Sequence, residues 1–143
     1  ASQAILFLGP SGSGKSQLAF RLLQRGAWLI ADDQTHLSPR GGAIWASCPP
    51  TIEGKLEVRG VGLIAAPHQV GASVRLILDL DPANRPAKAD LRMPEIRRWT
   101  PPRGFENTRP IPCVPFDASR QDAAEAVIAA LAQSREWEDS PAL

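Results

Sequence analysis

The sequence predicts an α/β domain, because apolar runs of strand length alternate with a glycine-rich loop and an amphipathic helix near its start. Residues 4–8 form a continuous apolar run that ends abruptly at Gly9, as buried strands do. Residues 16–25 place leucine and alanine at helical spacing and stop before Gly26, which suits the end of a helix. A second apolar run fills residues 27–31. Strand, loop, helix and strand in this order predict a βαβ-type unit.

The rest of the chain predicts further strands and one closing helix within a single domain, residues 1–143. Residues 82–110 are rich in proline and charge, so we expect a long loop there. Pro112 and Pro115 predict an edge position for the last strand, because proline donates no backbone hydrogen bond. The expected strands are residues 43–47, 56–64, 74–80 and 111–116, and the expected helix is residues 117–137 with Asp117 as its N-cap.

Composition narrows the classes of partner. The chain has 16 basic and 15 acidic residues and a formal net charge of +1, which argues against nucleic acid or a membrane surface, since both demand a basic patch. No apolar run reaches the roughly 18 residues of a membrane span, and no signal peptide is visible. Cys48 and Cys113 lack the neighbouring cysteines or histidines of a zinc site. We therefore expect a cytoplasmic protein.

The glycine-rich loop matches the phosphate-binding P-loop pattern G-x-x-x-x-G-K-[ST] at every position. Glycines allow the backbone to curl so that successive N–H groups converge on phosphate oxygens. The helix that follows directs the positive end of its dipole at the same place. We expect Lys15 to reach the β- and γ-phosphates of ATP and the Ser16 hydroxyl to bind Mg²⁺. The predicted nucleotide-binding residues are Gly9, Pro10, Ser11, Gly12, Ser13, Gly14, Lys15 and Ser16.

Three acidic residues are candidates for the chemistry that follows nucleotide binding. Asp32 and Asp33 end the second apolar run, and ligands of open α/β sheets bind at the carboxyl ends of strands. Neighbouring side chains on a strand face opposite ways, so only one of this pair points straight at the γ-phosphate. Glu57 shares a strand face with Arg59. The alternatives are that Asp32 and Asp33 only open a turn, and that Glu57 only lies on a solvated face.

Together these segments resemble the HPr kinase/phosphorylase catalytic domain, and look most like its short, single-domain bacterial forms. The most specific part is the Glu-x-Arg-Gly-x-Gly run at residues 57–62. The resemblance implies a mixed β-sheet with flanking helices, similar to the nucleotide-binding core of phosphoenolpyruvate carboxykinase. It covers most of residues 4–116. The segments that carry it are residues 9–16, 25–33 and 56–62, with residues 92–95 similar to the family's later arginine segment.

The resemblance also implies an activity. Members of this family use Mg²⁺ and ATP to phosphorylate a serine on HPr, a small phosphocarrier protein of the bacterial phosphotransferase system, in the regulation of carbon and nitrogen metabolism. By position, Asp33 matches the general base and Asp32 its acidic neighbour, while Glu57 matches a metal ligand. Arg92 matches a group that stabilises the transferring phosphoryl group, alongside Lys15. The partner implied is an HPr-like phosphocarrier, and the sequence is compatible with a homo-oligomer.

The chain departs from the family pattern at two places. The family carries a histidine in a strand hairpin before the loop, and none of the eight residues before Gly9 is a histidine. The family's C-terminal segment linked to phosphorolysis has no clear match between residues 118 and 143. We therefore expect kinase activity to exceed phosphorylase activity. Two other classes stay open: a small-metabolite kinase, which would need an acceptor pocket built from residues 82–110, and a nucleotide-sensing regulatory module with reduced catalysis.

Overall fold

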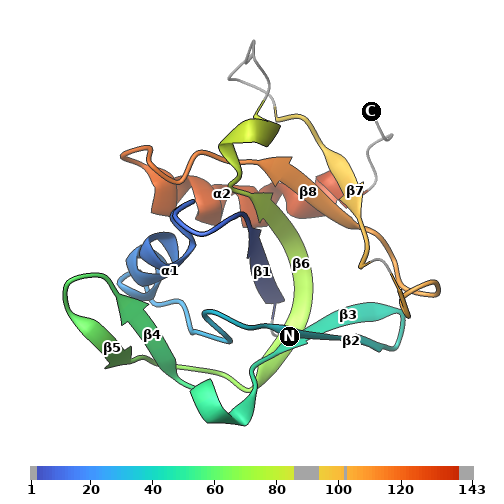
Figure 1. The fold of residues 1–143 in the computed structure, drawn as a ribbon. Coiled ribbons are helices and arrows are strands. Elements are labelled where there is room, and N and C mark those ends of the chain that lie inside the picture. The colour runs from blue at the N-terminus through green and yellow to red at the C-terminus, as the bar shows by residue number, and fades with distance from the viewer. Residues whose placement is uncertain (1–2, 86–93, 102, 139–143) are drawn as a thin grey trace.

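The protein is built on a curved mixed β-sheet (Figure 1). The computed structural model describes residues 3–85, 94–101 and 103–138. Six strands form the main sheet within these ranges: β1 (Gln3–Leu8), β2 (His36–Arg40), β3 (Ala43–Ser47), β6 (Gly71–Asp79), β7 (Arg97–Trp99) and β8 (Ile111–Pro115). Their order is β2-β3-β6-β8-β7, and β1 pairs with β6. Strand β6 is parallel to β1 and β8 but antiparallel to β3, which confirms the predicted mixed α/β class.

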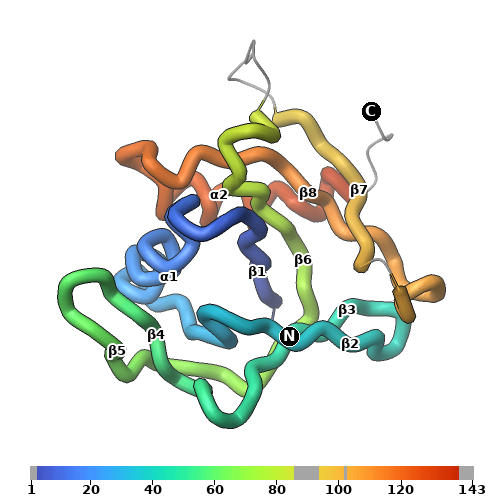
Figure 2. Tube along the Cα trace, in the orientation of Figure 1, coloured from blue at the N-terminus to red at the C-terminus, as the bar shows by residue number. Residues whose placement is uncertain are grey.

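A second, two-stranded sheet lies apart from the main sheet, on the side of the first helix (Figure 2). It is a hairpin, which we call the β4–β5 hairpin. The remaining elements are β4 (Lys55–Val58), β5 (Gly62–Ala65), the helices α1 (Lys15–Leu23) and α2 (Ala123–Glu138), and the 3-10 turns η1 (Pro50–Ile52) and η2 (Pro82–Asn84). No helix in the described part of the chain combines the length and apolar character of a bilayer span.

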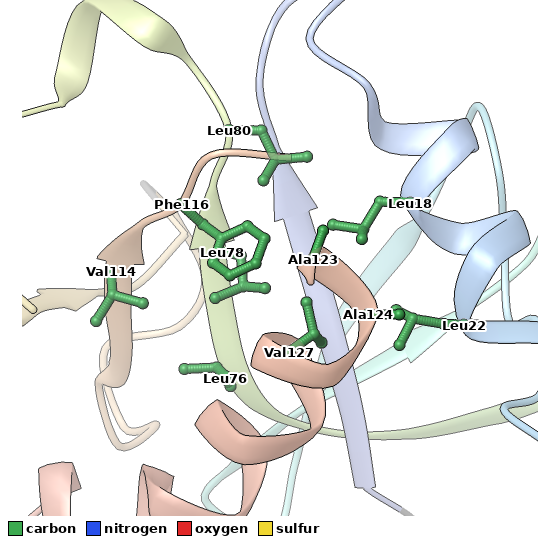
Figure 3. Close-up of a cluster of buried hydrophobic side chains, with 10 residues drawn as sticks. All are labelled: Leu18, Leu22, Leu76, Leu78, Leu80, Val114, Phe116, Ala123, Ala124 and Val127. Carbon is green, nitrogen blue, oxygen red and sulfur yellow. The ribbon is translucent and has the colours of Figure 1, made fainter. Parts of the chain in front are cut away.

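The main core lies between one face of the sheet and the two helices (Figure 3). Its leucines on β6 alternate with residues that face the other way, as strand geometry dictates. Leu18 and Leu22 lie on the same side of α1, one turn apart, and pack against this face. A separate cluster beneath the β4–β5 hairpin contains Leu29, Leu56 and Ala66. The main cluster consists of Leu18, Leu22, Leu76, Leu78, Leu80, Val114, Phe116, Ala123, Ala124 and Val127.

The predicted strand at residues 27–31 is wrong. Among the described residues, Leu29 forms only an isolated bridge to His68, and its side chain packs with Leu56 rather than with the main sheet. The parallel neighbour of β1 is instead β6, along the whole length of β1. The choice of neighbour depends on contacts between segments distant in sequence, which an apolar run cannot encode by itself. The chain therefore lacks the predicted βαβ unit at this position.

Strand β8 lies inside the sheet, between β6 and β7, so the predicted edge position is wrong. Successive N–H groups of a strand point to opposite sides. Phe116 N donates to Asp79 O of β6 at 2.9 Å, so Pro112 also faces β6 and Pro115 faces β7. The ladder with β6 begins only at Cys113, and the ladder with β7 ends there. The nitrogen of each proline therefore faces a neighbouring strand at a position where the two strands form no ladder hydrogen bond, so the missing N–H costs nothing there.

Two further boundaries differ from the prediction. Helix α2 begins at Ala123 rather than at Asp117. The carboxylate of Asp117 accepts hydrogen bonds from the N and Oγ of Ser119, at 2.9 and 2.6 Å, and so forms a local turn before the helix instead of an N-cap. The predicted loop at residues 82–110 contains η2 and the short strand β7. Strand β7 exists because β8, the next strand in the chain, pairs with it.

Candidate active site

The glycine-rich loop follows the carboxyl end of β1 and leads into α1 (Figure 1), and its motif, residues 9–16, includes the first two residues of this helix. Gly12 and Gly14 have φ angles of 84° and 96°, a left-handed backbone that favours glycine. The loop turns back on itself, since Ser13 N donates to Pro10 O at 3.1 Å. A Cβ on Gly14 would lie only 3.1 Å from the Cβ of Ala118. Both conformation and close packing therefore account for glycine at position 14.

The N-terminus of α1 is open to an anion. Gly14 caps the helix without a side-chain hydrogen bond, and the first turn carries no acidic residue. The first N–H groups of a helix have no intrahelical partner, and the helix dipole is positive at this end. Lys15 Nζ donates to Gly9 O at 2.6 Å, which keeps the ammonium group beside the loop. Free N–H groups, the dipole and the ammonium group thus converge at one place, as anion sites require.

Asp32 joins two other segments at the end of this loop. Ser16 Oγ donates to Asp32 Oδ1 at 2.7 Å, and the backbone N of Glu57 donates to Asp32 Oδ2 at 3.1 Å. Segments far apart in sequence therefore meet at one carboxylate: the start of α1, the segment after it and strand β4. The sequence prediction that Asp32 neighbours the glycine-rich loop agrees with this geometry, although the residue follows an irregular segment and not a strand.

The carboxylates of Asp33 and Glu57 remain open. Both residues are exposed, and no hydrogen bond or ion pair of either side chain occurs among the described residues. Glu57 reaches Asp32 through its backbone alone, so its carboxylate stays available to an incoming group. Arg92, the fourth predicted catalytic residue, lies outside the described residues.

The residues around Ser16 fit Mg²⁺ bound with a nucleotide. The Ser16 hydroxyl donates a hydrogen bond to Asp32, which leaves the oxygen lone pairs free for a cation. The described residues contain no group of three or more His, Cys, Asp or Glu side chains able to hold a metal ion by themselves. Magnesium does not require such a group, because it keeps several waters and binds one or two protein ligands together with phosphate oxygens.

A cavity of about 370 Å³ lies along β1, between this strand, α1 and residues 27–32. Its lining is mainly apolar, and Lys15 and Asp32 are among its few polar residues. None of residues 9–14 lines it, although Lys15 does, so the cavity adjoins the glycine-rich loop without including it.

Two acidic residues near the loop, Asp79 and Asp117, were not predicted from the sequence to belong to the site. Asp79 ends β6 opposite Leu8 of β1, and its carboxylate accepts bonds from Asp81 N at 3.0 Å and Asn84 Nδ2 at 2.9 Å. It thereby anchors η2, the turn that precedes the segment with Arg92. Its position at the end of the strand that pairs with β1 could have identified Asp79 as a site residue. The sequence did not predict the pairing of β1 with β6, so this position was not recognised.

Asp117 lies in the turn that packs against the glycine-rich loop. Its turn holds Ala118 against Gly14, and Arg85 Nη2 lies 3.4 Å from Asp117 Oδ1. The pKa of Asp117 is lowered, first by the side-chain hydrogen bond from Ser119, with smaller contributions from the Ser119 backbone and the charge of Arg85. A carboxylate that stays ionised preserves this turn, and with it the surface on which the glycine-rich loop packs.

The fold is that of an α/β protein, and its candidate site lies at the carboxyl edge of a mixed sheet. The profile of one family, described as the HPr Serine kinase C-terminal domain, matches residues 2–78. The chain belongs to this family. Its relatives include the HPr kinase/phosphorylase of Bordetella petrii, 48% identical over 61 residues, and that of Clostridium tetani, 44% identical over 69 residues.

These alignments cover 42% and 48% of the chain but only 20% and 23% of the two relatives. The chain thus matches less than a quarter of the length of these proteins. A solved structure, described as the Hpr(Ser) kinase/phosphatase from Coxiella burnetii, superposes with a TM-score of 0.77. The superposition covers 95% of this chain and 90% of the other at 22% identity, which confirms the fold.

Proposed function

We propose that the chain is an ATP-dependent protein serine kinase of the cytoplasm that phosphorylates HPr or a related phosphocarrier. The observation that carries this proposal is the arrangement of Ser16, Asp32 and the backbone of Glu57 beside an uncapped helix N-terminus. A nucleotide-binding kinase needs these groups in one place: donors for phosphate, a hydroxyl for the metal ion and carboxylates beside it. Family membership supports the same class of reaction.

The proposed reaction transfers the γ-phosphoryl group of ATP to a serine hydroxyl. The loop N–H groups and Lys15 bind the phosphates, and Lys15 exchanges its bond with Gly9 O for bonds to phosphate oxygens. Mg²⁺, when bound with ATP, neutralises charge on the β- and γ-phosphates. Asp33 accepts the proton of the serine hydroxyl as its oxygen bonds to phosphorus and the bond to ADP breaks. The exposure of Asp33 gives the serine of a protein substrate access to it.

Ser16 and Glu57 are the proposed metal ligands. The Ser16 oxygen is oriented by its bond to Asp32, and the Glu57 carboxylate extends from the neighbouring strand. Arg92 is proposed to neutralise the transferring group. Asp33 is exposed, which favours a serine on a protein surface over the closed acceptor pocket that a small-metabolite kinase would need.

The test is to incubate the chain with Mg·ATP and purified HPr proteins and to identify phosphoserine by mass spectrometry. Phosphoserine formed by the parent and not by Asp33→Asn supports the proposal. Tight ATP binding with no transfer to any carrier would instead support a nucleotide-sensing module. If only small hydroxylated metabolites were phosphorylated, the protein-kinase assignment would be wrong.

The direction of the reaction can be tested in the same system. Phosphorolysis needs inorganic phosphate held in line with phosphoserine by groups beyond those that bind ATP. We predict that pyrophosphate release from phosphoserine carrier and phosphate is much slower than the forward reaction. Equal rates in the two directions would contradict this prediction and would show that the glycine-rich loop alone serves both reactions.

A further inference from the structure

The β4–β5 hairpin forms a sheet of its own, so something must hold it in place. An isolated two-stranded hairpin is marginally stable, and no strand of the main sheet pairs with this one in the described part of the chain. Its inner face packs through Leu56 and Ile64 on Leu29 and α1. Apolar packing of this kind resists separation, but it is not directional and does not define the position of β4 along α1.

A directional contact comes from Asp32. In the hairpin, Leu56 pairs with Ile64 and Glu57 with Leu63. Ala66 N donates to Gly54 O at 2.9 Å, so the even-numbered residues of this strand exchange hydrogen bonds with β5. The N–H of Glu57 therefore points away from β5, and it donates to Asp32 Oδ2. Without Asp32, this N–H would have no partner except water.

The same carboxylate accepts the Ser16 hydroxyl at 2.7 Å through its other oxygen. One side chain thus links the first turn of α1 to the strand that carries Glu57. We propose that Asp32 is a positioning residue that fastens the β4–β5 hairpin to the N-terminal turn of α1. Its function is to hold the Glu57 carboxylate at a constant distance from the Ser16 hydroxyl.

This role deepens the proposed function, since Ser16 and Glu57 are the proposed metal ligands, but the contact itself exists without any ligand. The role also differs from that of a second base. Both oxygens of Asp32 are occupied by donors of the chain, whereas the Asp33 carboxylate is exposed. The two neighbouring aspartates therefore have different roles: Asp32 positions Glu57 relative to Ser16, and Asp33 is the proposed general base.

Hydrogen exchange of the Glu57 amide, followed by NMR in protein free of metal and nucleotide, tests the link directly. Asp32→Ala removes the acceptor, and we expect the Glu57 amide to exchange at least about tenfold faster, because hydrogen bonds to charged groups are among the stronger ones. Asp32→Asn keeps an amide oxygen toward Glu57 and an amide NH₂ toward Ser16, so it should retain most of the protection. Amides of β6 report that each variant remains folded.

One control and one replacement variant complete the set. Asp33→Ala removes the adjacent carboxylate and should leave exchange at Glu57 unchanged. If Asp32→Ala does not fold, Asp32→Ser replaces it, because the shorter side chain cannot reach both donors.

Unchanged exchange at Glu57 in Asp32→Ala, or in Asp32→Ser, would overturn the proposal, and so would exchange in Asp32→Asn as fast as in Asp32→Ala.

A second measurement extends the test to the ligand. By calorimetric titration with Mg·ATP, Glu57→Gln should weaken binding in the parent but have little further effect in Asp32→Ala. Equal effects in both backgrounds would also overturn the link. Failure of the chain to bind ATP would refute the proposed function and would leave the exchange result standing.

Discussion

The helix-covered face of the sheet and its carboxyl edge are held together by different forces. On the face, Leu76, Leu78 and Leu80 are completely buried against the helices (Figure 3). At the edge, the glycine-rich loop, Asp32 and the β4–β5 hairpin are joined by single hydrogen bonds between half-buried or exposed groups. Stability and chemistry therefore depend on different parts of the molecule. Substitutions on the face should change the free energy of unfolding, and substitutions at the edge should change activity.

The largest effect is expected at the edge, from Asp33→Asn. The amide keeps the shape of the side chain but cannot accept a proton, so phosphoryl transfer to the carrier should fall by roughly 10²–10⁴-fold, as losses of general base catalysis do. Thermal unfolding should be unchanged because Asp33 is exposed. The measurement is the initial rate of phosphoserine formation.

A matched control is Asp122→Asn, which replaces another exposed carboxylate, one that pairs with Arg120. It should retain the parent rate. If Asp33→Asn retained full activity while Asp32→Asn lost it, the roles assigned to the two aspartates would be reversed.

On the buried face, Leu78→Ala should destabilise the protein by about 2–5 kcal/mol, because it removes a side chain from a closely packed core and leaves a cavity. Leu78 has an exposed fraction of 0%. The measurement is the free energy of unfolding from urea denaturation. Leu63→Ala is the matched control, since Leu63 is 73% exposed, and it should change stability by no more than about 0.5 kcal/mol. Equal losses from the two variants would remove the contrast between the buried face and the surface.

The smallest effect concerns Asp117, which lies between the two regions. Its lowered pKa means that the ionised form is favoured in the folded state. The resulting stabilisation is fully present above the unfolded pKa, ordinarily 3.8, and is lost as the pH falls through the lower folded pKa. Ser119→Ala removes the largest contribution and should move the Asp117 pKa upward, as measured by NMR titration of its carboxyl carbon. An unchanged pKa would show that the hydrogen bond from Ser119 does not stabilise the carboxylate.

Local patterns predicted local features well. The strands near residues 43–47 and 74–80 and the first helix follow from the periodicity of nearby residues, and the structure has all of them. The single strand expected at residues 56–64 is wrong, because the chain reverses direction within this range and forms the β4–β5 hairpin. What the sequence could not supply was the choice of partners. The pairing of β1 with β6 and of β6 with β8 joins segments tens of residues apart in the sequence. Strand β7 depends on its pairing with β8, the strand that follows it.

The candidate site shows the same difference between local features, which the sequence predicts, and contacts between distant segments, which it does not. The motif of residues 9–16 located the glycine-rich loop, and the position of Asp32 after an apolar run placed it near the loop. The bond from the Glu57 backbone to Asp32 could not be foreseen, because it depends on where a separate hairpin packs. Asp79 was missed for the same reason, since its relation to the loop follows from the register of β1 on β6.

The central claim, that the glycine-rich loop binds the phosphates of ATP, is tested most directly by calorimetric titration of Lys15→Ala with Mg·ATP. The variant removes the ammonium group that lies beside Gly9 O, and we predict binding weaker by about 10- to 100-fold, the usual loss for a charge-assisted contact. Lys55→Ala, which removes an exposed lysine of β4, should bind as the parent does. If Lys15→Ala bound Mg·ATP as tightly as the parent, the loop would not be the nucleotide site.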